Sequence, residues 1–195
     1  MKTDTILVSS RGREMETALK QAEKAAAYKG LGTKSALQLR LLTEEMMGLM
    51  RSITGETEGA FWIEDEEGVY QLHLKTENRM DEKQKEELIA VSSEGRNEAA
   101  KGLMGKIRAF FEPAGGTPVF AGLFMPGSSP QMYQSMSWSM TDYKKRVARM
   151  REEHQAGAEE AWDELEKSVV AHVADDIRVS IRGGEAELII IKKLA

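Results

Sequence analysis

The chain has 195 residues, of which 41% are hydrophobic and 30% are charged, so it is long enough to bury one substantial core. Its formal net charge of −5 gives no overall attraction to nucleic acid or to an anionic membrane surface, and we expect neither as a partner. The lack of cysteine excludes disulfides and thiolate metal sites, and the three widely separated histidines form no ligand-spaced motif, so we expect no metal site.

The first predicted element is a strand within residues 3–10, where "TDTILVSS" alternates apolar and polar positions. A helix follows, because apolar residues then recur at helical spacing over residues 15–26. We expect it to end at "YKGLGTKS", whose glycines suit a helix C-terminus. Thr33 or Ser35 can then cap a second helix, which is predicted over residues 34–53.

The segment "FWIEDEEGVYQLHLKTE" predicts a β-hairpin with arms at residues 61–64 and 69–75 and a turn at residues 65–68. Two further helices are expected in residues 80–95 and 96–112, because each stretch has a helical pattern and ends at glycine or proline.

Residues 113–140 interrupt these patterns with proline, glycine, serine and methionine, and they predict a long loop. Such a loop suits a lid or an adaptable partner-binding surface, and it equally suits a segment folded back over the core. Residues 141–176 then predict helical structure with a break near Gly157, and the chain closes with a hairpin around Gly183-Gly184. Basic residues at 144–151 fit either a phosphate-binding surface or a solvated helix face.

This order of elements favours the α+β class. We predict one domain over residues 1–195, a two-layer sandwich in which helices cover one face of a mixed or antiparallel sheet, with a loop insertion at 113–140.

The second helix carries two adjacent carboxylates, Glu44 and Glu45, within an otherwise apolar pattern. At about 100° per residue, Glu44 points away from the apolar stripe. Glu45 lies on the shoulder of the stripe, together with Gly48. It therefore either reaches into a cleft where the glycine leaves room for a ligand, or extends from the edge of the core into water. The stripe itself consists of Leu39, Leu42, Met46, Leu49, Met50 and Ile53.

The order of elements, and the first 75 residues in particular, resemble the histidine-kinase-type ATPases, especially their anti-sigma-factor kinase branch. In that branch a strand and a helix lead to a second helix with the pattern "LxLxxEExxxN", followed by a hairpin that ends in "DxGxG". Here "LQLRLLTEEMMGLM" corresponds to the second helix, "FWIEDEEGVYQLHL" corresponds to the hairpin, and the terminal hairpin corresponds to the strands that end the family's sheet.

The resemblance implies ATP as the ligand and assigns roles to five residues. Glu45 matches the glutamate that activates water or a hydroxyl nucleophile. Thr76 and Glu77 stand where the family has its adenine-binding aspartate. Gly102 and Gly105, in "KGLMGKIRAFF", resemble the glycine-rich box beside the phosphates, where amides at a helix N-terminus face the anion.

The sequence also departs from the family at these positions. Leu49 occupies the place of the asparagine that helps to hold Mg²⁺, which argues against a magnesium site, and "TENRMDEK" lacks the glycines of "DxGxG". The first hypothesis is therefore a cytoplasmic regulatory protein that binds ATP in a divergent site. The alternative is a non-enzymatic protein-interaction module that has lost nucleotide binding. Both imply a protein partner, and a homodimer stays open.

Overall fold

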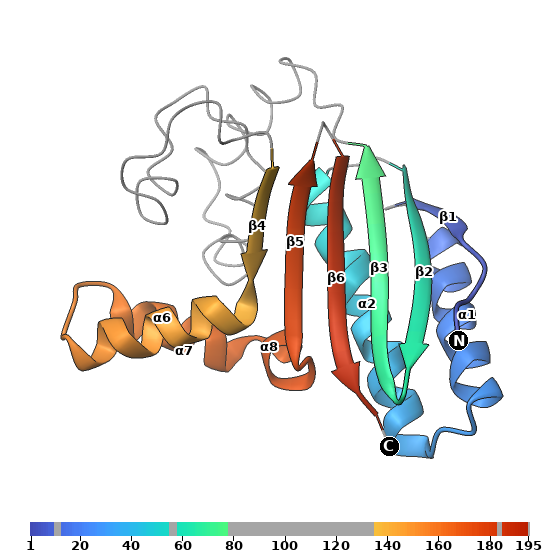
Figure 1. Cartoon of the computed structure of the whole chain (residues 1–195), viewed down its shortest axis with the longest axis horizontal. Helices are drawn as coiled ribbons and strands as arrows, with labels where there is room; N and C mark the ends of the chain where they lie inside the picture. The colour runs from blue at the N-terminus through green and yellow to red at the C-terminus, as the bar shows by residue number, and fades with distance from the viewer. Residues whose placement is uncertain (10–12, 55–57, 78–134, 183–184, 195) are drawn as a thin grey trace.

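The computed structural model describes residues 1–9, 13–54, 58–77, 135–182 and 185–194. Within these residues six strands form one sheet in the order β1-β2-β3-β6-β5-β4, and every neighbouring pair is antiparallel (Figure 1). The strands are β1 (Ile6–Ser9), β2 (Glu58–Glu66), β3 (Val69–Glu77), β4 (Ser135–Ser139), β5 (Asp176–Arg182) and β6 (Glu185–Lys193). The described helices are α1 (Arg13–Tyr28), α2 (Thr33–Thr54), α6 (Met140–Glu152), α7 (Ala158–Lys167) and α8 (Val169–Val173).

Helices α1 and α2 lie side by side behind the sheet, and the opposite face of the sheet is turned toward the viewer in Figure 1. Helix α8 contacts α2, and α6 follows directly after β4. The α+β class and the helices on one face of the sheet are therefore confirmed. Of the two sheet types left open by the sequence, the described strands form the antiparallel one.

The amphipathic pattern of α2 forms the centre of the core. Five side chains of the predicted stripe are at most 1% exposed, and they are Leu39, Leu42, Met46, Leu49 and Met50. Thr43 is also fully buried, and its hydroxyl donates to the Leu39 carbonyl one turn earlier at 2.9 Å, which satisfies the only polar group on this part of the stripe. Helix α1 presents a buried stripe of small side chains, which lets it pack closely beside α2.

The β2–β3 hairpin turns tightly at Glu67 and Gly68, whose φ angles are +52° and +83°. Two successive positive φ angles are typical of a type I′ turn, whose twist matches that of the flanking strands. The turn fixes the register, so that Phe61 faces Leu74 and Trp62 faces His73 across the ladder. Alternate residues therefore point toward the helices and toward the open face.

The C-terminal hairpin completes the sheet, because β6 pairs with β3 on one side and with β5 on the other. Leu188 and Ile190 of β6 and Ile177 and Val179 of β5 are buried toward the helices, at most 4% exposed. These two positions of β5 therefore form its inward face. The predicted turn residues, 183–184, lie outside the described residues.

Two carboxylates, one buried and one half-buried, join elements that are distant in sequence. Asp65 of β2 is 5% exposed, and its Oδ2 lies 2.6 Å from Lys29 Nζ, just after α1. The hydrogen bond from Lys29 holds the pKa of Asp65 below its ordinary value. Asp176 of β5 accepts hydrogen bonds from the Thr141 amide at 3.0 Å and from its hydroxyl at 2.9 Å, so it caps the start of α6 from a neighbouring strand.

The structure differs from the sequence prediction near the end of the predicted loop. Residues 135–139 form strand β4, paired with β5, and Trp138 is only 5% exposed. The alternation in "SMSWS" places Trp138 on the covered face, where it contributes to the core. The predicted break at Gly157 is confirmed, since this residue has φ of +79° immediately before α7. The helices predicted in residues 80–95 and 96–112, and the loop up to residue 134, lie outside the described residues.

Candidate functional site on helix α2

Glu45 is half-buried on α2, while its neighbour Glu44 is exposed. Burial, together with the adjacent Glu44 carboxylate, raises the pKa of Glu45 above its ordinary value. A raised carboxyl pKa is one property of a general base that works near neutral pH. A catalytic base is also normally oriented by a hydrogen bond, and no such contact to the Glu45 carboxylate is found among the described residues.

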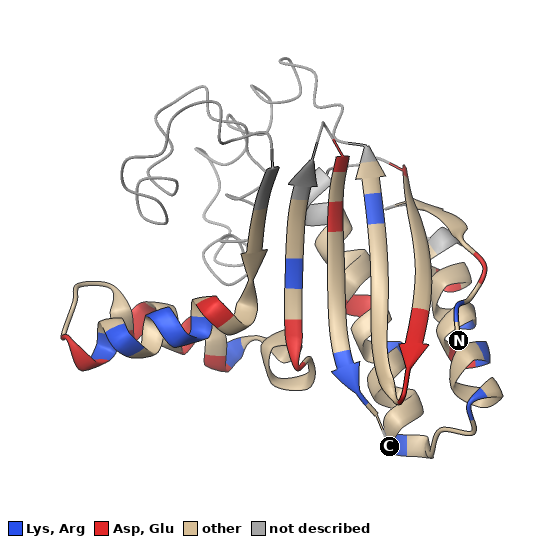
Figure 2. Cartoon of the chain, viewed as in Figure 1, with Lys and Arg blue, Asp and Glu red and all other residues tan. Residues whose placement is uncertain are grey.

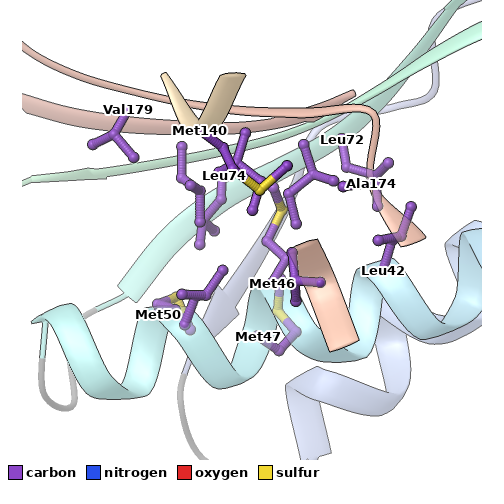
Figure 3. Packing of buried hydrophobic residues seen from close by; sticks show 14 of the residues in the cluster. Leu42, Met46, Met47, Met50, Leu72, Leu74, Met140, Ala174 and Val179 are labelled. Atoms are coloured by element: carbon purple, nitrogen blue, oxygen red, sulfur yellow. The ribbon is translucent and has the colours of Figure 1, made fainter. Parts of the chain in front are cut away.

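Met46 follows Glu45 directly on α2, Leu49 lies about one helical turn after Glu45, and both are 0% exposed. Figure 3 shows Met46 and Leu42 pointing from α2 toward the sheet, where they belong to the same hydrophobic cluster as Leu72 and Leu74 of β3. The position that corresponds to the family's Mg²⁺-binding asparagine is therefore part of the hydrophobic core. Apolar side chains cannot supply the oxygen ligands that Mg²⁺ requires.

Thr76 lies near the end of β3 and is 4% exposed. It points to the helix side of the sheet, since a Cβ atom placed on Gly59 of the neighbouring strand would lie 3.0 Å from Thr76 Cγ2 and 3.0 Å from Leu74 Cδ1. The methyl group of Thr76 thus packs against Gly59, where a side chain on the glycine would crowd it. Glu77 ends β3 and pairs with Glu185 through the backbone.

Thr76 and Glu45 belong to β3 and α2, which pack against each other, and this places the two residues on the same side of the sheet. The predicted phosphate-binding glycines, Gly102 and Gly105, lie outside the described residues, as does most of the predicted lid at 113–140. The assignment of these two glycines therefore stays a prediction.

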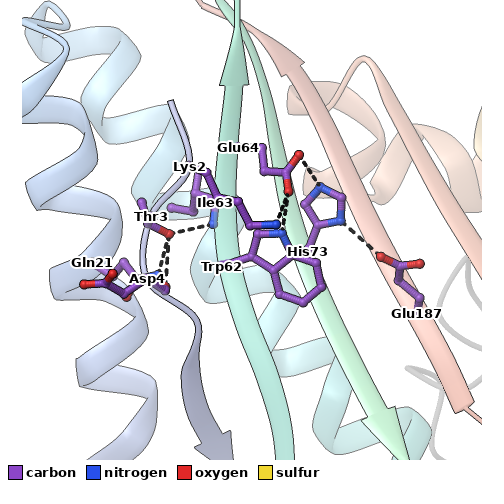
Figure 4. Close-up of polar contacts among 9 residues, drawn as sticks. All are labelled: Lys2, Thr3, Asp4, Gln21, Trp62, Ile63, Glu64, His73 and Glu187. Carbon is purple, nitrogen blue, oxygen red and sulfur yellow. Dashed lines mark hydrogen bonds and ion pairs between the residues drawn. The ribbon is translucent and has the colours of Figure 1, made fainter.

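A second cluster, not predicted from the sequence, lies on the open face of the sheet. The rings of Trp62 and His73 stack with centroids 4.7 Å apart and planes 7° apart (Figure 4). His73 Nδ1 lies 3.2 Å from Glu187 Oε1, and Trp62 Nε1 donates to Glu64 Oε1 at 2.9 Å. Lys2 Nζ lies 2.8 Å from the same oxygen of Glu64.

The residues of this open-face cluster contact one another by ring stacking, hydrogen bonds and ion pairs, as is typical of neighbouring side chains on one face of a sheet. The sequence contains a signal for it, because Trp62 and His73 are equidistant from the two-residue turn at Glu67 and Gly68 and therefore face each other. Its chemistry is that of strand pairing by stacking and by ion pairs across the ladder.

The basic run on α6 is largely engaged within the chain. Lys144 Nζ donates to the Ala171 carbonyl at 2.7 Å, and Arg151 Nε lies 3.1 Å from Glu159 Oε1 on α7. Figure 2 shows the basic positions of α6 beside acidic positions of α7. These contacts favour the solvated-face interpretation of the run over a phosphate-binding surface.

Among the described residues, no group of three or more histidine, aspartate or glutamate side chains is arranged to hold a metal ion. None of the described helices is both long enough and apolar enough to cross a membrane. No protein-family model matches the chain, and no curated protein matches it in sequence.

Proposed function

We propose that this chain is a non-enzymatic protein-interaction module of the cytoplasm, with a regulatory role, built on a sheet-and-helix scaffold like that of the histidine-kinase-type ATPases. The observation that carries the proposal is the complete burial of Met46 and Leu49, which follow Glu45 on α2. In a working site of the resembled type, the position of Leu49 would face Mg²⁺ and nucleotide. Here it contributes to the free energy of folding instead.

The order and pairing of the strands support the likeness to that scaffold. A strand and two helices precede the β2–β3 hairpin, and the terminal β5–β6 hairpin joins the sheet directly beside β3. The residues at the ligand positions support the loss of nucleotide binding, because Leu49 is apolar and Thr76 packs its methyl group against Gly59.

The competing function, ATP binding in a divergent site, draws its support from Glu45. A half-buried carboxyl with a raised pKa is a feature that catalytic bases share. The two functions differ in a direct way, because only the second requires the purified protein to bind nucleotide and requires Glu45 for its chemistry.

Isothermal titration calorimetry with ATP and ADP, with and without Mg²⁺, separates them. The proposal predicts no binding heat for the wild-type protein, for Glu45→Gln or for the matched control Glu44→Gln. Binding at micromolar strength, about −8 kcal/mol, would refute the proposal and establish a nucleotide site, whether or not the glutamine variants change the affinity. A known ATP-binding protein in the same buffer serves as the positive control.

A further inference from the structure

The outer face of α2, which we define as Leu37, Leu41, Glu44, Glu45 and Gly48, has an unusual composition for a solvated helix surface. These five residues fall within an arc of about 100°, which runs from the side of the helix opposite the core stripe to the shoulder of the stripe at Glu45. Leu37 is 60% exposed, Leu41 and Glu45 are half-buried, and Glu44 and Gly48 are exposed. The face therefore combines apolar side chains, two adjacent carboxylates and a glycine.

The two carboxylates have no cationic partner among the residues that the structure describes. The basic residue nearest to them along α2, Arg40, pairs instead with Glu23 of α1. On the open face of the sheet, by contrast, Glu64 pairs with Lys2 and Glu185 pairs with Lys75. A half-buried carboxylate beside a second carboxylate is electrostatically unfavourable in the isolated chain, and a cation from outside would relieve that cost.

Gly48 leaves the surface open at the end of this face. A Cβ atom built on Gly48 would have no heavy atom within 4 Å. A glycine within a helix lowers helix stability relative to alanine, so its presence here needs a compensating reason. Close approach of another helix, whose side chain occupies the space above the glycine, is such a reason.

We propose that the outer face of α2 binds a basic amphipathic helix of a protein partner, whose Lys or Arg side chains meet Glu44 and Glu45 and whose apolar side chains pack on Leu37, Leu41 and Gly48. This inference rests on the proposed function, since it names the surface through which the interaction module acts. The occupant follows from charge complementarity and from the apolar strip beside the carboxylates. Nucleic acid and anionic lipid are disfavoured by the same negative charge.

The test uses the full-length chain and a fluorescein-labelled synthetic helix, followed by fluorescence anisotropy. The probe peptide carries leucines at i, i+3, i+4 and i+7 spacing and lysines at its remaining charged positions, and a matched peptide carries glutamate in place of each lysine. The wild-type protein is expected to bind the basic peptide at least about tenfold more tightly than the acidic one, and this preference should weaken as salt is added.

The variants locate the binding surface. Glu44→Gln/Glu45→Gln is expected to weaken binding of the basic peptide about fivefold or more. The control Glu152→Gln/Glu153→Gln makes the same change in net charge at another adjacent pair, near the end of α6, and should change the affinity by less than about twofold. Gly48→Leu should also weaken binding, and because leucine is the better helix former, lost affinity cannot come from an unfolded α2.

Equal affinity for both peptides, or an equal loss in the two glutamine pairs, would overturn the inference. So would unchanged affinity in Gly48→Leu. These outcomes leave the proposed function standing if calorimetry shows no nucleotide binding, whereas nucleotide binding refutes the proposed function whatever the peptide does. The two failures are therefore distinguishable.

Discussion

Replacing Leu49 by asparagine restores the residue that the resembled family uses for Mg²⁺, and the structure predicts that the chain will not tolerate it. Leu49 is 0% exposed. The substitution forfeits about 1.5–3 kcal/mol of apolar burial and adds about 1–3 kcal/mol for an amide left without partners. We therefore expect the free energy of unfolding to fall by about 2.5–6 kcal/mol, and the melting temperature by roughly 5–24 °C.

The assay is urea denaturation followed by circular dichroism, with Leu37→Asn as the matched control. Both variants make the same change within α2, so the difference in helix propensity is shared. Leu37 is 60% exposed, and its replacement should cost no more than about 1 kcal/mol. Equal losses for the two variants would contradict the reasoning, because they would show that position 49 does not lie in the core.

Three further predictions concern stability. Because the Lys29 hydrogen bond lowers the pKa of Asp65 in the folded state, this carboxylate stabilises the fold above its unfolded pKa of about 3.9, and the stabilisation is lost as the pH falls through the lower folded pKa. The free energy of unfolding should therefore fall less steeply with decreasing pH in Asp65→Asn than in the wild-type protein. An unchanged slope would refute the role of the Lys29–Asp65 pair. Asp176→Ala should cost about 1–3 kcal/mol in urea denaturation, since the amide and hydroxyl of Thr141 lose their acceptor, and a loss below about 0.5 kcal/mol would argue against this cap. Gly68→Ala should lower the melting temperature, because φ is +83° there and the added Cβ would lie 3.1 Å from a backbone carbonyl oxygen; an unchanged value would show that the turn relaxes freely.

The sequence predicts most of the described secondary structure because its signals are local. The 3.6-residue period of α2 identifies five of its core residues, all at most 1% exposed. The Glu67-Gly68 turn lies within the turn predicted at residues 65–68, since glycine readily adopts positive φ at the second turn position.

Contacts between distant elements were beyond these local signals. The pairing of β6 with β3 joins segments more than 100 residues apart, and the period of neither strand specifies its partner. The ion pair of Lys29 with Asp65 and the cap on α6 from Asp176 likewise depend on tertiary packing. The sequence predicts loop where β4 forms, because serine and methionine in "SMSWS" carry little strand preference. Pairing with β5 and burial of Trp138 decide the conformation instead.

The candidate site was predicted in part. The helical period placed Glu45 on the shoulder of the stripe, and the half-buried side chain agrees with this position. Whether that shoulder faces a ligand depends on what packs around Leu49 and Thr76, which a single sequence cannot specify. The burial of both residues is what favours an interaction module over an ATPase.

The most direct test of the account is an NMR titration of protein labelled with ¹³C at the methionine methyl groups, with MgATP added to millimolar concentration. Met46, Met47 and Met50 are the buried methionines of α2 closest in sequence to the position of the missing asparagine, and they are at most 3% exposed. Their methyl resonances, assigned by single Met→Leu substitutions, report on anything that enters beside the helix. The account predicts that none of the three shifts. Saturable shifts of these resonances, absent when AMP is added in its place, would contradict it and would place a triphosphate nucleotide beside α2.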